Sequence, residues 1–177
     1  MSRLLGAVIA GGQSRRFGSD KAEALWQGQK LIDHVVAAVR PAVDELVICG
    51  RQRDGLTSLP DRPAADMGPL GGLNAALHHA REQGFAGVLT AGCDTPLLPA
   101  ELFARLLASG NAAYVARLPV IGYWPVALAV ELDAFLAQDR KHSIRAFADL
   151  VGAEGVGWGD LANVNEPADL AALRGAK

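Results

Sequence analysis

Strand-like and helix-like segments alternate along this chain, and their order is the feature that most constrains its fold. Short apolar runs that are typical of buried strands cover residues 4–10, 45–49, 87–91 and 112–116. Between these runs, apolar residues recur at helical spacing over residues 31–43, from 69 to 84 and from 99 onward. Such alternation predicts an α/β fold whose mostly parallel sheet is covered by helices on both faces.

The C-terminal part of the sequence is predicted to add further elements to this sheet. We expect a hairpin within residues 118–130, helices over 131–138 and 143–150, a strand near Val156 and a helix from Pro167. No internal repeat or low-complexity linker interrupts the 177 residues, and half of them are hydrophobic. This length and composition predict a single domain over residues 1–177 with a substantial core.

Charge, hydropathy and cysteine content argue against several classes of protein. The formal net charge is −2, so we expect no overall basic field that would attract nucleic acid. The first apolar run is interrupted by Gly6 and is too short for a signal peptide or a membrane span, so we expect no membrane association. Cys49 and Cys93 lack the spacing of zinc ligands, and we expect both to be reduced thiols in a cytoplasmic protein.

The loop after the first predicted strand combines glycines with cationic side chains. Residues 9–21 read IAGGQSRRFGSDK, in which Gly11 and Gly12 are followed by Arg16 and Lys21. At the carboxyl end of a strand, glycines let backbone N–H groups approach an anion closely, which favours a polyphosphate ligand. The segment matches neither the P-loop pattern nor GxGxxG, so a Walker ATPase and a dinucleotide-binding fingerprint are not supported. The alternative is a surface loop whose basic residues are only solvated.

Two further groups of polar residues follow later in the chain. Asp94 comes just after the third predicted strand, where one carboxylate can hold Mg²⁺ while phosphate oxygens and water complete its coordination. The alternative role for Asp94 is to cap the helix that follows. Asn165 precedes Glu166 and Pro167 as a helix N-cap would, whereas Asn163 has no such structural explanation.

These motifs occur together, and in this order, in a known family. The chain resembles the MobA-like molybdenum cofactor guanylyltransferases, whose N-terminal pattern LAGGxSxRMGxxK it matches with Ile9 and Phe17 as apolar replacements. Further similar stretches are PDRPAADMGPLGG, CDTPLLP, WPVAL and NVNEPADL, which begin at residues 60, 93, 124 and 163. Residues 139–142 depart from the family pattern, which often has a glycine followed by a basic residue there. The resemblance covers almost the whole chain and implies a Rossmann-like three-layer fold.

The resemblance also implies a reaction. The family transfers GMP from GTP to the terminal phosphate of molybdopterin, or of its molybdenum-bearing form, and releases pyrophosphate. Arg16 would contact the outer phosphates, Lys21 the phosphate on which charge grows, and Asp94 the Mg²⁺. The implied nucleotide-binding residues are Ala10, Gly11, Gly12, Lys21, Asp61, Gly68 and Asp94. Asn163, Asn165 and Trp124 would position the phosphate or the acceptor.

Two other functions stay open on the sequence alone. A cytidylyltransferase or sugar-nucleotide transferase would use the same chemistry, although by resemblance such relatives usually have alanine before a single glycine where Gly11 and Gly12 stand. A catalytically silent nucleotide-binding protein would be marked by loss of the cation or the metal ligand, and Lys21 and Asp94 are both present. The resemblance further implies other cofactor-biosynthesis proteins and molybdoenzyme chaperones as partners.

Overall fold

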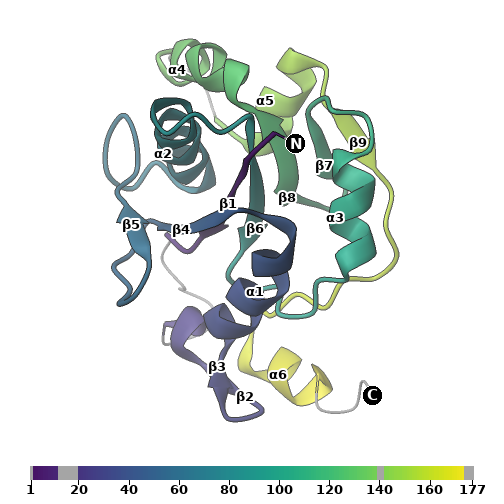
Figure 1. Ribbon diagram of the computed structural model, residues 1–177. Helices are drawn as coiled ribbons and strands as arrows, with labels where there is room; N and C mark the ends of the chain where they lie inside the picture. Colours follow the sequence, from purple (N-terminus) through teal and green to yellow (C-terminus); the bar gives the residue numbers. More distant parts are fainter. Residues whose placement is uncertain (1, 12–19, 139–141, 174–177) are drawn as a thin grey trace.

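A seven-stranded sheet forms the centre of the computed structural model, which describes residues 2–11, 20–138 and 142–173 (Figure 1). The strand order is β5-β4-β1-β6-β8-β7-β9. The strands are β1 (Leu4–Ile9), β4 (Glu45–Cys49), β5 (Thr57–Leu59), β6 (Gly87–Gly92), β7 (Ala113–Val115), β8 (Leu118–Pro125) and β9 (Glu154–Val156). Every neighbouring pair is parallel except those that β8 makes with β6 and β7. The mostly parallel sheet predicted from the sequence is therefore confirmed.

Helices cover both faces of this sheet (Figure 1). The covering helices are α1 (Leu31–Val39), α2 (Pro69–Glu82), α3 (Ala100–Leu107), α4 (Ala129–Leu136) and α5 (Ile144–Val151), whereas α6 (Pro167–Leu173) packs away from the sheet. Leu5 and Ala7 of β1 belong to the core beneath α2, α4 and α5, whereas Val8 belongs to the core beneath α1 and α3. Because both faces of the central strands are buried, those strands are continuous apolar runs in the sequence.

A small separate core joins the end of the described chain to its beginning. The hairpin of β2 (Leu25–Trp26) and β3 (Gln29–Lys30) lies outside the large sheet, next to α6 at the bottom of Figure 1. Trp26, Leu31, Val164 and Leu173 are buried together there, and we call this group the C-terminal cluster. The segment that leads into α6 is thus held against the hairpin and the start of α1.

The expected hairpin within residues 118–130 is instead a single strand. β8 pairs with β7 across a short turn and is followed by the 3-10 helix η3 (Val126–Leu128) and α4. Pro119 falls where the register between β7 and β8 shifts, so its missing N–H interrupts no regular ladder. Strand β5 was not predicted from the sequence. Two of its three residues are Thr57 and Ser58, so it forms no apolar run.

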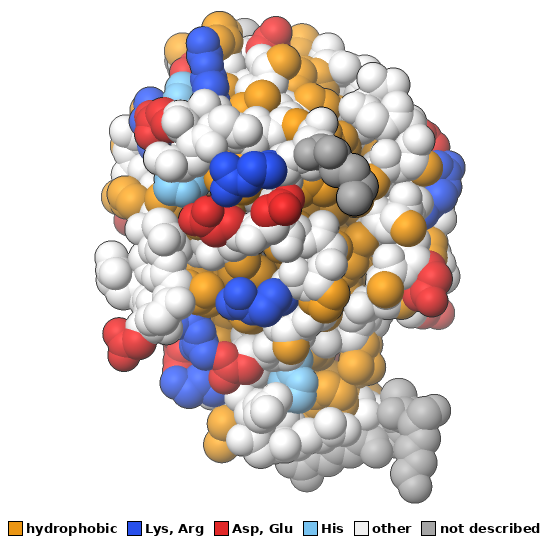
Figure 2. All heavy atoms as spheres, in the orientation of Figure 1, with side chains coloured by type: hydrophobic (Ala, Val, Ile, Leu, Met, Phe, Trp, Pro, Cys, Tyr) orange, Lys and Arg blue, Asp and Glu red, His pale blue; other side chains and the backbone are white. Residues whose placement is uncertain are grey.

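Charged side chains on the surface are mixed in sign. Figure 2 shows Lys and Arg beside Asp and Glu on the face in view, with no broad region of one charge. Ion pairs such as Arg105–Glu154, at 2.7 Å, link elements that are far apart in the sequence. Within the described ranges, no helix is long and apolar enough to cross a membrane.

Candidate active site

Two adjoining hollows lie along the edge of the sheet where β1, β4 and β6 end. The larger has a volume of about 510 Å³, and its lining includes Gly11, Gly50, Arg51, Asp61, Asp66 and Gly68. The smaller has a volume of about 280 Å³, and its lining includes Ala10, Gly11, Asp20, Lys21, Cys93 and Asp94. Gly11 borders both, so the hollows form one cleft at the position where open α/β sheets bind ligands.

The charged pair of the smaller hollow is formed by Lys21 and Asp94. Asp94 stands two residues beyond β6, and Lys21 opens the 3-10 helix η1 (Lys21–Glu23), whose first turn is capped by Asp20. The Lys21 ammonium lies 2.8 Å from Asp94 Oδ2, and each side chain is 21% exposed. A cation and an anion therefore meet at the mouth of the hollow, where both can still reach a ligand.

Two glycines let the loops after β1 and β4 cross at close range. Gly50 has φ +83°, a left-handed conformation that residues with a side chain rarely adopt. A Cβ atom on Gly50 would lie only 2.5 Å from the Gly11 Cα. A Cβ on Gly11 would in turn lie 3.2 Å from the Gly50 Cα. We call this crossing of the Gly11 and Gly50 backbones the floor of the cleft, and a side chain at Gly50 has no room there.

Asp61 and Gly68 lie on the larger hollow, at the beginning of α2. The carboxyl group of Asp61 accepts a hydrogen bond from the Met67 backbone, and burial raises its pKa above the ordinary value, with a smaller contribution from the negative charge of Asp66. Gly71, in the first turn of α2, packs so tightly here that a Cβ would lie 2.9 Å from the Asp61 Cβ. A partly buried carboxyl group is thereby held on the wall of the hollow.

Asn163 and Asn165 reach the same charged pair from the C-terminal segment. The backbone N–H of Val164 donates to the Asp94 carbonyl at 2.8 Å. With its amide oriented so that donors face acceptors, Asn163 donates to the Asp94 carbonyl at 3.2 Å and to Asp94 Oδ1 at 3.3 Å. Its oxygen accepts from Asn165 Nδ2 at 3.1 Å. Asn163 therefore contacts one carboxylate oxygen of Asp94 while Lys21 contacts the other.

Asp169, and not Asn165, provides the cap at the start of α6. One carboxylate oxygen of Asp169 accepts from the backbone N–H of Asn165 at 2.7 Å and from that of Glu166 at 2.8 Å. These two bonds hold the pKa of Asp169 below its ordinary value. The side chain of Asn165 is thereby left to contact Asn163, so the N-cap that the sequence suggested for Asn165 is not formed by its side chain.

Arg51 is a residue of the cleft that sequence reasoning missed. It follows Gly50 at the carboxyl end of β4, and its side chain is 20% exposed. The guanidinium donates to the Ala10 carbonyl at 3.4 Å and to Glu23 at 3.2 Å, and it also binds Asp20. Arg51 follows an apolar run, and the carboxyl ends of parallel strands meet at one edge of the sheet. This position could have indicated that Arg51 lies near the glycine loop.

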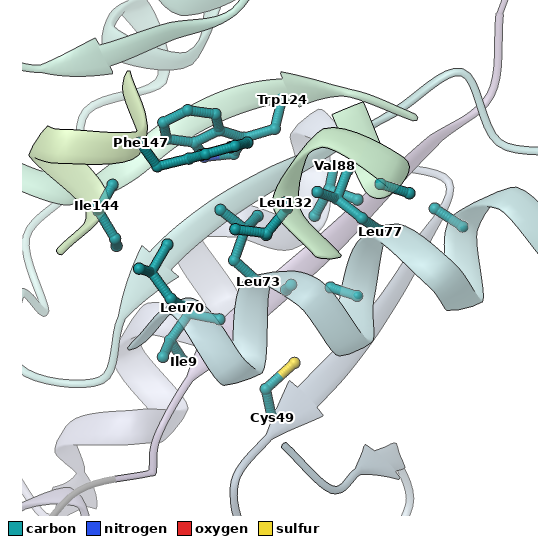
Figure 3. Close-up of a cluster of buried hydrophobic side chains, with 14 of the residues drawn as sticks. Ile9, Cys49, Leu70, Leu73, Leu77, Val88, Trp124, Leu132, Ile144 and Phe147 are labelled. Carbon is teal, nitrogen blue, oxygen red and sulfur yellow. The ribbon is translucent and has the colours of Figure 1, made fainter. Parts of the chain in front are cut away.

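Trp124 does not line a ligand site, which corrects the expectation from its motif. Its side chain is fully buried, and its ring centroid lies 6.0 Å from that of Phe147 in the core under α5 (Figure 3). The indole N–H donates to the Thr90 hydroxyl at 3.1 Å. The motif gives no information on which face of β8 a residue occupies. Trp124 was therefore assigned to a pocket although it lies in the apolar core.

The remaining residues singled out from the sequence either lie outside the described ranges or are buried thiols. Gly12 and Arg16 lie outside the described residues. Cys49 and Cys93 are free, buried thiols, and burial raises the pKa of Cys49 to about 12 and that of Cys93 to about 11. Within residues 2–11, 20–138 and 142–173, no three His, Cys, Asp or Glu side chains are grouped so that they could hold a metal ion by themselves. A metal at Asp94 would need further oxygens from water or from a bound ligand.

The cleft at the strand ends, with its opposed lysine and aspartate, lies in a stretch of chain that a family model described as the MobA-like NTP transferase domain matches over residues 6–153. The protein is therefore a nucleotidyltransferase. The chain belongs to this MobA-like family.

Individual relatives agree with this assignment over nearly their full length. A molybdenum cofactor guanylyltransferase from Cereibacter sphaeroides is 38% identical over 183 residues, covering 96% of this chain and 94% of the relative. Among solved structures, the molybdopterin-guanine dinucleotide biosynthesis protein A from Archaeoglobus fulgidus has a TM-score of 0.75 at 22% identity, with 95% of each chain covered. A Mycobacterium tuberculosis protein solved in complex with manganese has a TM-score of 0.69 at 16% identity, covering 99% of this chain and all of that one. Both structures show the same fold.

Proposed function

We propose that this protein is a molybdenum cofactor guanylyltransferase, which transfers GMP from GTP to the terminal phosphate of molybdopterin or of its molybdenum-bearing form. Pyrophosphate is the second product. The observation that carries the proposal is the Lys21–Asp94 pair, at 2.8 Å, on a cleft whose floor is the backbone of Gly11. The 38% identical relative of almost equal length carries this activity in its name.

The two hollows of the cleft suit the two ends of a nucleotide. The larger hollow takes the base and ribose, where the carboxyl group of Asp61 and the backbone around Gly68 offer hydrogen-bonding groups. The smaller hollow takes the phosphates, beside the Gly11 backbone and the Lys21 ammonium. Because the reacting groups are all anionic, this enzyme has mainly to neutralise charge and fix geometry, and it needs no covalent nucleophile.

Asp94 has the properties required of a Mg²⁺ ligand. Mg²⁺ is usually held by one or two carboxylates, and water and substrate phosphates complete its coordination. The Asp94 carboxylate is partly exposed on the phosphate side of the cleft, and both oxygens are oriented by Lys21 and Asn163. When bound, the metal supplies positive charge that stabilises the phosphate oxygens during displacement. The manganese complex of the M. tuberculosis structure supports a divalent ion as the cofactor.

Lys21 and the two asparagines then act on the phosphates directly. Lys21 neutralises charge that grows as the bond to pyrophosphate breaks, and it is a compact point charge suited to that task. Asn163 and Asn165 form a chain of amides that ends at Asp94, and this contact supports a role for them beside the acceptor phosphate. Their amide groups can hydrogen-bond a phosphate and fix its direction of approach.

The decisive experiment measures pyrophosphate release by the purified protein with Mg²⁺, molybdopterin and each of the four nucleoside triphosphates in turn. We expect release with GTP that depends on molybdopterin. Release with CTP in place of GTP would identify a cytidylyltransferase instead. Nucleotide binding without any release, under conditions in which a known guanylyltransferase turns over, would identify a silent binding protein.

A further inference from the structure

Arg51 contacts three groups near Lys21. Its Nε donates to the Ala10 carbonyl, Nη1 to Glu23 and Nη2 to Asp20. Ala10 follows the last residue of β1, whereas Asp20 and Glu23 stand on either side of Lys21 in η1. One guanidinium therefore ties the segment that carries Lys21 to the carboxyl ends of both β1 and β4.

Asp20 links this contact to the local conformation of η1. One of its carboxylate oxygens accepts from the Ala22 backbone N–H at 3.2 Å and caps the helix. The other oxygen binds Arg51. Because the two oxygens have separate partners, the capped turn and the guanidinium are held as one unit. The planar fork of an arginine suits this arrangement, since its N–H groups point in fixed directions toward different acceptors.

Arg51 binds the two carboxylates nearest to Lys21 in the chain. Asp20 and Glu23 are anions within two residues of Lys21, and both are held by Arg51, with Glu23 bound by Lys30 as well. Without Arg51, Asp20 could compete with Asp94 for the lysine, whereas Glu23 would keep Lys30. With Arg51 in place, Lys21 lies 2.8 Å from Asp94.

We propose that Arg51 is a positioning residue, which holds Lys21 at Asp94 by binding the carboxylates of Asp20 and Glu23. This inference rests on the catalytic role proposed for Lys21. Arg51 also lines the larger hollow, so direct contact with the nucleotide is the competing role. The two roles differ in what they predict: positioning lowers the rate through Lys21, whereas direct contact weakens nucleotide binding.

A double-mutant cycle with Lys21 separates these roles. The parent, Arg51→Ala, Lys21→Ala and the double variant are compared by kcat for pyrophosphate release and by calorimetric Kd for GTP. We expect Arg51→Ala to lower kcat on the order of tenfold or more, since small displacements of a catalytic group are costly, and to change Kd by less than about threefold. In the Lys21→Ala background, the same change should lower kcat by less than about twofold, because the group that it positions is gone.

Arg53→Ala is the matched control. Arg53 is two residues further along the chain, forms an ion pair with Asp33 of α1 and is 22% exposed, close to the 20% of Arg51. It should leave kcat at the parental value. Asp20→Asn tests the same contact from the other side, because asparagine keeps the helix cap while it removes the charge that Arg51 binds. This variant should reproduce part of the kcat loss, and it serves in the cycle if Arg51→Ala lowers the melting temperature severely.

Several results would overturn the inference. If the fold-losses of kcat in the two single variants multiply in the double variant, Arg51 acts independently of Lys21. A raised Kd with parental kcat would assign Arg51 to nucleotide binding. If Lys21→Ala itself kept the parental kcat, the role proposed for Lys21 would fail first, and the positioning inference would fail with it.

Discussion

The ammonium of Lys21 and the carboxylate of Asp94 meet at 2.8 Å although 73 positions separate them in the chain. Each follows the end of one of two adjacent parallel strands, β1 and β6, so the topology of the sheet brings them together. In this structure the two charges neutralise each other. In the proposed reaction, the cation would contact the phosphates and the anion would hold the metal.

Asp94→Asn should abolish turnover and leave the fold intact. The substitution removes a full charge at nearly constant volume, so Mg²⁺ loses the carboxylate proposed to hold it. The ion pair with Lys21 is partly exposed, and its loss should lower the free energy of unfolding by less than about 1 kcal/mol. Pyrophosphate release over a range of Mg²⁺ concentrations, beside a denaturant melt, checks both statements. Near-parental release at modest Mg²⁺ would remove Asp94 from the metal site.

Lys21→Ala should reduce the rate more than the affinity. A preorganised cation beside a reacting phosphate stabilises the transition state more than the ground state, so we expect kcat to fall on the order of a hundredfold or more while GTP binding weakens far less. For Arg16, placed from the sequence alone, the expected result of replacement by alanine is mainly a raised KM. Steady-state rates beside calorimetric GTP binding distinguish the two patterns. A normal kcat for Lys21→Ala would limit the lysine to binding.

Asn165→Ala should lower activity with little effect on stability. Since Asp169 supplies the cap of α6, removal of the Asn165 side chain should change the free energy of unfolding by less than about 0.5 kcal/mol, as at most surface positions. It should nevertheless lower kcat, because the amide chain to Asp94 is broken. Asp169→Ala is the complementary variant and should lower the melting temperature through loss of two bonds to backbone N–H groups. Equal melting temperatures with unchanged rates would show that neither contact matters.

Asp61→Asn should stabilise the protein at neutral pH and impair GTP binding. Burial raises the folded-state pKa of Asp61 above 3.8, so the folded protein holds this proton more tightly than the unfolded chain does. Ionisation therefore costs stability as the pH rises through the raised pKa, and this cost is absent at pH values below 3.8. The melting temperature of the variant relative to the parent should increase as the pH rises from about 4 through the raised pKa of Asp61 and should stay constant above it. A constant difference would mean that Asp61 titrates normally.

Gly50→Ala should disrupt the floor of the cleft. A residue with a Cβ at positive φ costs about 1–2 kcal/mol, and here the new atom would also lie 2.5 Å from the Gly11 Cα. Gly55→Ala is the control, because Gly55 has a similar φ of +77° but no atom within 4 Å of its would-be Cβ. We expect both variants to lose stability and only Gly50→Ala to lose GTP affinity. Equal effects on GTP affinity would show that the close approach of the two loops is unimportant.

The sheet was predictable because its strands are buried on both faces. β1, β4 and β6 each contain a buried, mostly apolar run, and helical segments separate them in the sequence, so the fold class and its layers could be predicted from the pattern. Strand order was not predictable, because an apolar run carries no information about its neighbours. The direction of β8 was missed for the same reason: nothing in a run from Leu118 to Pro125 shows that it lies antiparallel between β6 and β7.

The site was predictable where its residues follow strand ends or match a family motif. Lys21, Asp94 and Asn163 meet these conditions and lie together in the structure. Arg51 was missed because its partners are remote in sequence, and a single arginine after a strand has many possible roles. Trp124 was misplaced because side-chain burial depends on α5, which packs on β8 from a later part of the chain.

The C-terminal cluster has a consequence for how the site can open. Every strand of the large sheet is complete at Val156, whereas Asn163, which contacts Asp94, comes later, with Val164 anchored against Trp26 and Leu31. Detachment of this small core would therefore remove Asn163 from Asp94 and leave every strand pairing of the large sheet in place.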